Sequence, residues 1–176
     1  MADVNDKARK LLLLKMQEII EANTGSLKEI NLCDFTEQPD EGIKLIDSIA
    51  KNAKINLIEL LAIQYNSELF KKTEFTDAFC LLLGKQATLE FLDLSGNDMD
   101  ESATTKVLNS IKDSEFREKI KYLILQACNW YEDSACEALA DFIAKAPSLE
   151  SVDLKDQIGS RPIKVYVNKS SVEVWR

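Results

Sequence analysis

Few side chains in this sequence could carry catalytic or metal chemistry. The chain has no histidine, which removes the commonest general base, the usual base partner of a serine or cysteine nucleophile, and the commonest metal ligand. The densest acidic cluster, Asp98, Asp100 and Glu101, could hold a cation or supply an acid and a base. It precedes a segment of helical period, where carboxylates ordinarily cap a helix and face its positive end. We therefore expect no enzyme activity, no metal and no cofactor.

Composition narrows the class of protein further. The four cysteines include no C-x-x-C pair, which favours reduced thiols in an intracellular protein over disulfides or a zinc site. A net charge of −8 and a pI of about 4.7 argue against nucleic-acid binding, which needs a lysine- and arginine-rich face. No apolar run approaches the length of a membrane span. The expectation is one cytoplasmic domain, residues 1–176, that binds neither nucleic acid nor membrane.

One spacing of aliphatic residues recurs five times along the chain. Each copy is a nine-residue stretch with aliphatic residues at its first, fourth and sixth positions, and the copies begin 31, 31, 31 and 29 residues apart, at Leu27, Ile58, Leu89, Ile120 and Leu149. In the copy "LEFLDLSGN", Leu92 and Leu94 alternate as on a strand, and the chain then turns. At the ninth position a buried Asn97 amide is expected to satisfy backbone groups of that turn.

Segments of helical period separate the copies. In "DESATTKVLNSIKD" the apolar positions fall on one face of a helix, and "DSACEALADFIAKA" repeats that arrangement after the fourth copy. A strand followed by a crossover helix places parallel strands on one side and helices on the other. The sequence therefore predicts an α/β fold with a repeated strand–helix unit.

The motif L-x-x-L-x-L-x-x-N/C resembles the leucine-rich repeat, over Leu27 through Gln157. The repeat length and full helix are similar to the ribonuclease-inhibitor class, which Ran GTPase-activating protein and the tropomodulins share; "NTGSLKEINL" and "KQATLEFLDLSGNDM" look most like the tropomodulin C-terminal domain. The resemblance implies a solenoid of about five repeats (26–158) with its parallel sheet on the concave face. Residues 1–25 are expected as an N-terminal helical cap. Residues 159–176 are expected as a C-terminal β cap, either a hairpin or an added strand.

In such a solenoid the third, fifth and seventh motif positions face away from the core. They bring large apolar residues together at Leu60, Phe91, Tyr122 and Ile124, and this pattern predicts a partner-binding patch. The expected polar and charged neighbours of the patch are Glu29, Asp93, Gln126, Asp153 and Lys155. The alternative is that the C-terminal segment or the N-terminal helix covers the patch.

A loop after the fourth strand supplies one more candidate. Tyr131 lies in "ACNWYEDS", where loops between repeats emerge and often carry contacts, and Trp130 beside it is expected in the core.

These features predict a protein–protein interaction module rather than an enzyme. Binding would use the concave sheet face and adjoining loops, and the acidic balance favours a basic partner. The family resemblance implies two narrower options: binding to actin at a filament end, as tropomodulin does, or activation of a small GTPase's hydrolysis, as Ran GTPase-activating protein does. A structural subunit, docked into a larger assembly by its convex helices, is a further alternative.

Overall fold

The computed structural model describes most of the central part of the chain. The described residues are 27–33, 39–52, 57–128, 133–155 and 173–175, together with Leu11, Leu14, Lys15, Glu18, Ile20, Ala22 and Ile55. The isolated N-terminal residues are helical, and Ile20 among them is buried, with its carbonyl accepting from the Asn52 side chain at 2.7 Å. The rest of the predicted N-terminal helix lies outside the described residues.

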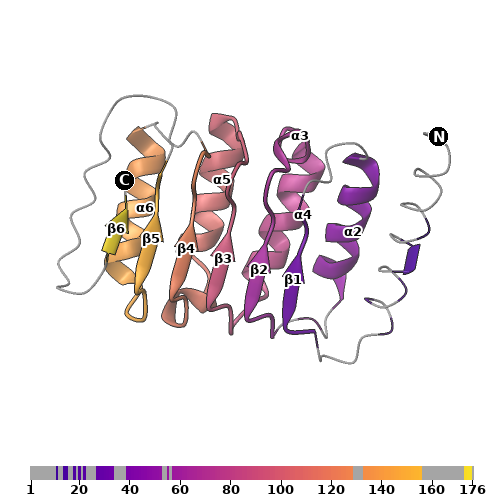
Figure 1. The fold of residues 1–176 in the computed structure, drawn as a ribbon, viewed down its shortest axis with the longest axis horizontal. Helices are drawn as coiled ribbons and strands as arrows, with labels where there is room; N and C mark the ends of the chain where they lie inside the picture. Colours follow the sequence, from indigo (N-terminus) through magenta and orange to yellow (C-terminus); the bar gives the residue numbers. More distant parts are fainter. Residues whose placement is uncertain are drawn as a thin grey trace.

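The described residues form one parallel sheet with its strands in sequence order (Figure 1). Its strands are β1 (Glu29–Asn31), β2 (Leu60–Ala62), β3 (Phe91–Asp93), β4 (Tyr122–Ile124), β5 (Ser151–Asp153) and β6 (Glu173–Trp175). The connections carry α2 (Pro39–Lys51), α3 (Ser67–Phe70), α4 (Thr73–Gly84), α5 (Glu101–Lys112), the 3₁₀ turn η1 (Glu115–Glu118) and α6 (Asp133–Lys145). This arrangement confirms the predicted α/β class with a parallel sheet.

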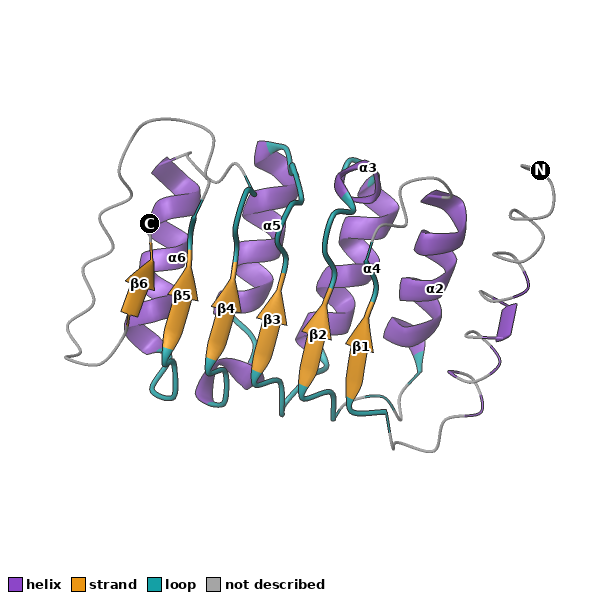
Figure 2. Ribbon diagram, viewed as in Figure 1, coloured by secondary structure: helices purple, strands orange, loops and turns teal. Residues whose placement is uncertain are grey.

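Helices and strands lie in two layers. Figure 2 shows α2, α4, α5 and α6 side by side on one face of the sheet, while none of the helices described in the central part covers the opposite face. We call that opposite side the open face. At the C-terminal end of the sheet β6 pairs with β5 in parallel. Residues 163–172, on which the alternative of a hairpin rests, lie outside the described residues, so the C-terminal β cap stays a prediction.

The core fills the space between the two layers. The middle residues of neighbouring strands are register partners, so Leu61, Leu92 and Leu123 stack in one row, and all three are fully buried. Leu89 and Leu94 are buried as well, which accounts for the spacing in "LEFLDLSGN". Because side chains alternate along a strand, the first and third residues of each strand point to the open face.

Helix α5 shows how the sequence places its elements. Its buried face is formed by Ala103, Thr104, Val107, Leu108 and Ile111, as the helical period predicts. Asp100 is its N-cap: one carboxylate oxygen accepts from the Ala103 N–H at 2.8 Å. This geometry confirms the expected capping role for Asp100, the middle residue of the acidic cluster.

A ladder of buried polar side chains closes the turns after the strands. The Asn97 amide donates to the carbonyls of Ile63 at 2.6 Å and Leu94 at 2.7 Å, and its oxygen accepts from the Asn66 N–H at 2.6 Å. Cys128 occupies the same motif position and its thiol donates to the Leu94 carbonyl at 2.9 Å. Burial raises the pKa of the Cys128 thiol to about 12, so it remains a protonated donor at neutral pH.

The residue before each of these three side chains has a left-handed backbone. Tyr65, Gly96 and Ala127 have φ of 55°, 70° and 50°, a region in which glycine is favoured. A Cβ added to Gly96 would lie 2.3 Å from Cδ1 of the Tyr65 ring. Tyr65 and Ala127 tolerate this φ with a side chain, so it is the close approach of the Tyr65 ring that makes glycine necessary at position 96.

We expect Gly96→Ala to lower the free energy of unfolding by about 1–2 kcal/mol, because it adds left-handed strain and displaces the Tyr65 ring. In a Tyr65→Ala background the same substitution should cost less, since only the strain remains. Urea unfolding of the two single variants and the double variant measures this difference. Gly84→Ala is the matched control: no atom lies within 4 Å of its added Cβ, so stability should not fall. Equal costs in both backgrounds would contradict the steric account.

Candidate functional site

Three adjacent strands bring the predicted apolar residues together on the open face. Leu60, Phe91 and Tyr122 are the first residues of β2, β3 and β4, and each is the register partner of the next. Leu60 and Phe91 are half-buried, and Tyr122 is 40% exposed. The ring centroids of Phe91 and Tyr122 lie 6.2 Å apart at an angle of 44°. We call these three residues the apolar row; Ile124, half-buried at the end of β4, lies on the same face.

Asp93, one of the polar neighbours predicted for the patch, makes its hydrogen bonds within the protein. It is only 5% exposed, although it points to the open face. One carboxylate oxygen accepts from the Ser95 N–H at 2.9 Å and from the Ser95 hydroxyl at 2.5 Å, and the other accepts from the Gln64 amide. Its carboxylate therefore holds the turn after β3. The place of Asp93 among the residues that bind a partner stays a prediction.

A similar set of hydrogen bonds, more exposed to solvent, surrounds Asp153 at the ends of β4 and β5. Gln126 donates to Asp153 at 2.6 Å, and the Lys155 N–H donates to the other Asp153 oxygen at 3.0 Å. The Lys155 ammonium lies 3.8 Å from the same carboxylate. All three side chains are half-buried, so the sheet brings these predicted residues together as one polar cluster beside Ile124. Glu29 lies apart from them at the other edge of the face, exposed on β1. Tyr131 lies outside the described residues.

A row of charged residues borders the apolar row. It was not predicted from the sequence, because only the third, fifth and seventh motif positions were expected to face away from the core. It occupies the residue before each strand: Lys28, Glu59, Glu90, Lys121 and Glu150. Lys28 pairs with Glu59 at 2.8 Å, and Lys121 pairs with Glu90 at 2.6 Å. The signal that could have revealed the row is a charge at the second position of all five motif copies.

Glu150 accepts a hydrogen bond from the Tyr122 hydroxyl at 2.6 Å. This bond raises the pKa of Tyr122 and holds its phenol neutral, with the ring fixed over the open face. When the charged row is counted with the outward third, fifth and seventh motif positions and the buried Asp93 is left out, five carboxylates accompany three lysines. They are Glu29, Glu59, Glu90, Glu150 and Asp153, against Lys28, Lys121 and Lys155. The open face is therefore apolar at its centre and negative at its borders.

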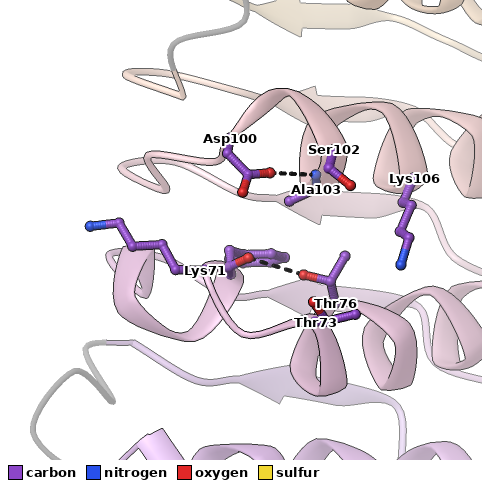
Figure 3. Close-up of a pocket in the computed structure, with 8 residues that line it drawn as sticks. Lys71, Thr73, Thr76, Asp100, Ser102, Ala103 and Lys106 are labelled. Atoms are coloured by element: carbon purple, nitrogen blue, oxygen red, sulfur yellow. Dashed lines mark hydrogen bonds between the residues drawn. The ribbon is translucent and has the colours of Figure 1, made fainter.

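A small hollow lies elsewhere, between the first turns of α4 and α5 (Figure 3). Its volume is about 30 Å³ and its lining includes Lys71, Thr76, Asp100 and Lys106. Thr76 donates to a backbone carbonyl and Asp100 caps α5, while Lys71 and Lys106 pair with Glu68 and Asp77. These polar groups do not converge on a common point, and the hollow is no larger than a water molecule requires.

Within the part of the chain that the structure describes, no three of the side chains that ordinarily bind metals lie close enough together to share an ion. The helices described there are all too short or too polar to cross a bilayer. The sequence matches no known protein-family model and no curated protein.

Proposed function

We propose that this protein is a leucine-rich repeat solenoid of the ribonuclease-inhibitor class, with residues 1–25 and 159–176 as its caps. Five motif copies that begin at equivalent positions, strands paired in register and helices on one face support this proposal. Asn66, Asn97 and Cys128, which repeat one buried bonding role every 31 residues, support it independently. In such a solenoid the open face is the concave face.

We infer that the protein binds a partner protein through this face. The observation that carries the inference is the partial exposure of Leu60, Phe91 and Tyr122 on a face that no described helix covers. The middle residues of these strands, Leu61, Leu92 and Leu123, fill the core between sheet and helices and are fully buried. The three outward residues are therefore not needed to fill that core. A row of large apolar side chains with charged borders is typical of a binding surface, and aromatic residues contribute most of the energy there.

The test is capture of a partner from a native extract, quantified by mass spectrometry. Phe91→Asp combined with Tyr122→Asp should abolish capture, because it places two charges at the centre of the contact. The free energy of unfolding should fall by less than about 2 kcal/mol, since both side chains are partly in solvent.

Leu81→Asp with Ala140→Asp is the matched control. Both residues are exposed on the helical side, Leu81 at 47%, and the change in net charge is the same. Capture that survives in the open-face variant would overturn the proposed site. Unfolding of that variant would place the two rings in the core.

A further inference from the structure

We propose that the partner segment is a basic amphipathic α-helix that lies across the strands, with its apolar stripe on Leu60, Phe91 and Tyr122. This inference rests on the proposed function and names the chemistry of the partner. Three properties of the open face support it: the sign of its border charges, the absence of backbone hydrogen-bonding groups at its centre, and the spacing of the apolar row.

The border charges favour a basic segment. Carboxylates outnumber lysines on this face, and the lysines Lys28 and Lys121 are already paired with Glu59 and Glu90. Among the described residues Glu29 forms no ion pair. Glu150 accepts a hydrogen bond there only from the neutral Tyr122 hydroxyl, and the ammonium whose pKa its charge raises, Lys121, is paired with Glu90. The Glu29 and Glu150 carboxylates stand at the β1 and β5 ends of the apolar row. Lysine or arginine side chains at the two ends of a bound segment would meet them.

The centre of the face favours a helix over an extended segment. The row presents side chains of Leu60, Phe91 and Tyr122, whereas the strand N–H and carbonyl groups there are paired within the sheet. An extended segment laid over it would bury its own backbone polar groups without partners, and each would cost about 1–3 kcal/mol. A helix satisfies its backbone internally and offers only side chains.

The spacing of the row agrees with the pitch of a helix. Adjacent strands are about 4.8 Å apart, and the Phe91 and Tyr122 ring centroids are 6.2 Å apart. These two values bracket the helical pitch of about 5.4 Å, so apolar residues on three successive turns can meet three successive strands. The four strand steps from Glu29 to Glu150 correspond to about 19 Å, which is the length of roughly 13 helical residues.

Fluorescence anisotropy with designed peptides tests the proposal. The probe is a labelled, stapled helix of about 14 residues, with leucines at i, i+4 and i+7 and lysines on both flanks. Three comparison peptides carry glutamate in place of lysine, shuffled leucines that remove the stripe, or a central proline in an unstapled chain. We expect the basic helix to bind at least about tenfold more tightly than each of the three.

Protein variants locate the site. Phe91→Ala should weaken binding of the basic helix about tenfold or more, as loss of an aromatic anchor does. Glu29→Gln with Glu150→Gln should weaken it about fivefold at low salt, while glutamine at 150 keeps an acceptor for the Tyr122 hydroxyl. The control, Glu115→Gln with Glu137→Gln, changes the net charge equally at exposed positions away from the face and should leave binding unchanged.

Several results would overturn this inference. Equal binding of the glutamate peptide would reject the basic partner, and equal binding of the proline peptide would reject the helix. A dimer in sedimentation velocity that Phe91→Ala abolishes would make a second copy the occupant. If no peptide binds while capture from extract still depends on Phe91 and Tyr122, the basic helix is wrong and the proposed function stands. Peptide binding with capture unaffected by those residues would instead reject the proposed function.

Discussion

Replacing Asn97 with leucine is expected to lower the free energy of unfolding by about 3–5 kcal/mol, although the two side chains are similar in size, because buried backbone groups lose their hydrogen-bond partners. The substitution removes the donor to the Ile63 carbonyl and the acceptor of the Asn66 N–H, both in a fully buried turn. The Leu94 carbonyl is affected less, because it also accepts from the Cys128 thiol. Leucine can occupy the volume but cannot bond to either backbone group. Urea unfolding followed by circular dichroism measures the loss.

Asn97→Cys is the informative control for this prediction. Cysteine occupies the equivalent position in the next repeat, where its thiol donates to a carbonyl, so a thiol at position 97 should restore the bond to Ile63. It restores the acceptor for Asn66 poorly, and we expect an intermediate loss of about 2 kcal/mol. If the leucine and cysteine variants were equally destabilised, the hydrogen bonds of this ladder would not be the cause.

The second large effect is expected at Phe79, whose replacement by alanine should cost about 3–5 kcal/mol. The Phe79 ring is fully buried, packs edge-on against Phe70 with centroids 5.4 Å apart, and stacks over Phe75 at 6.4 Å. Removing the ring leaves a cavity. The surrounding sheet and helices cannot close it without losing their own packing contacts. Thermal and urea unfolding of the variant measure the loss.

Phe91→Ala provides the comparison within the same molecule. Phe91 has the same side chain but lies half-buried on the open face, so its removal should cost less than about 1 kcal/mol. A loss similar to that of Phe79→Ala would show that Phe91 belongs to the core. That outcome would remove the central residue of the proposed binding surface.

The spacing of apolar residues predicted the main elements correctly. Strands begin at the third position of each motif copy, and Leu92 and Leu94 are both buried. The helical period of "DESATTKVLNSIKD" gives the buried face of α5. These features are encoded locally, because side-chain direction along a strand or helix follows from the backbone period.

The short α3 helix and the aromatic cluster could not be predicted in this way. Four residues are too few to show a period, and α3 is positioned by Phe70, which packs edge-on to Phe75 with centroids 5.0 Å apart. The burial of the Asp93 side chain is a second feature that the sequence alone could not predict. Its outward position was predicted. The hydrogen bonds from Ser95 are local, but Gln64, 29 residues earlier, reaches the carboxylate only when the strands pair.

The sequence by itself determined the repeated strand–helix unit, the parallel sheet, the inward leucines and the positions of Leu60, Phe91 and Tyr122 on the open face. Tertiary structure decided which polar residues of that face form hydrogen bonds within the protein, because contacts between neighbouring strands use Asp93 and leave Glu29 exposed. It also placed a charged row along one border and joined Tyr122 to Glu150. The physical reason is distance: periodicity acts over a few residues, whereas these contacts join residues about one repeat apart, which meet only when the repeats stack.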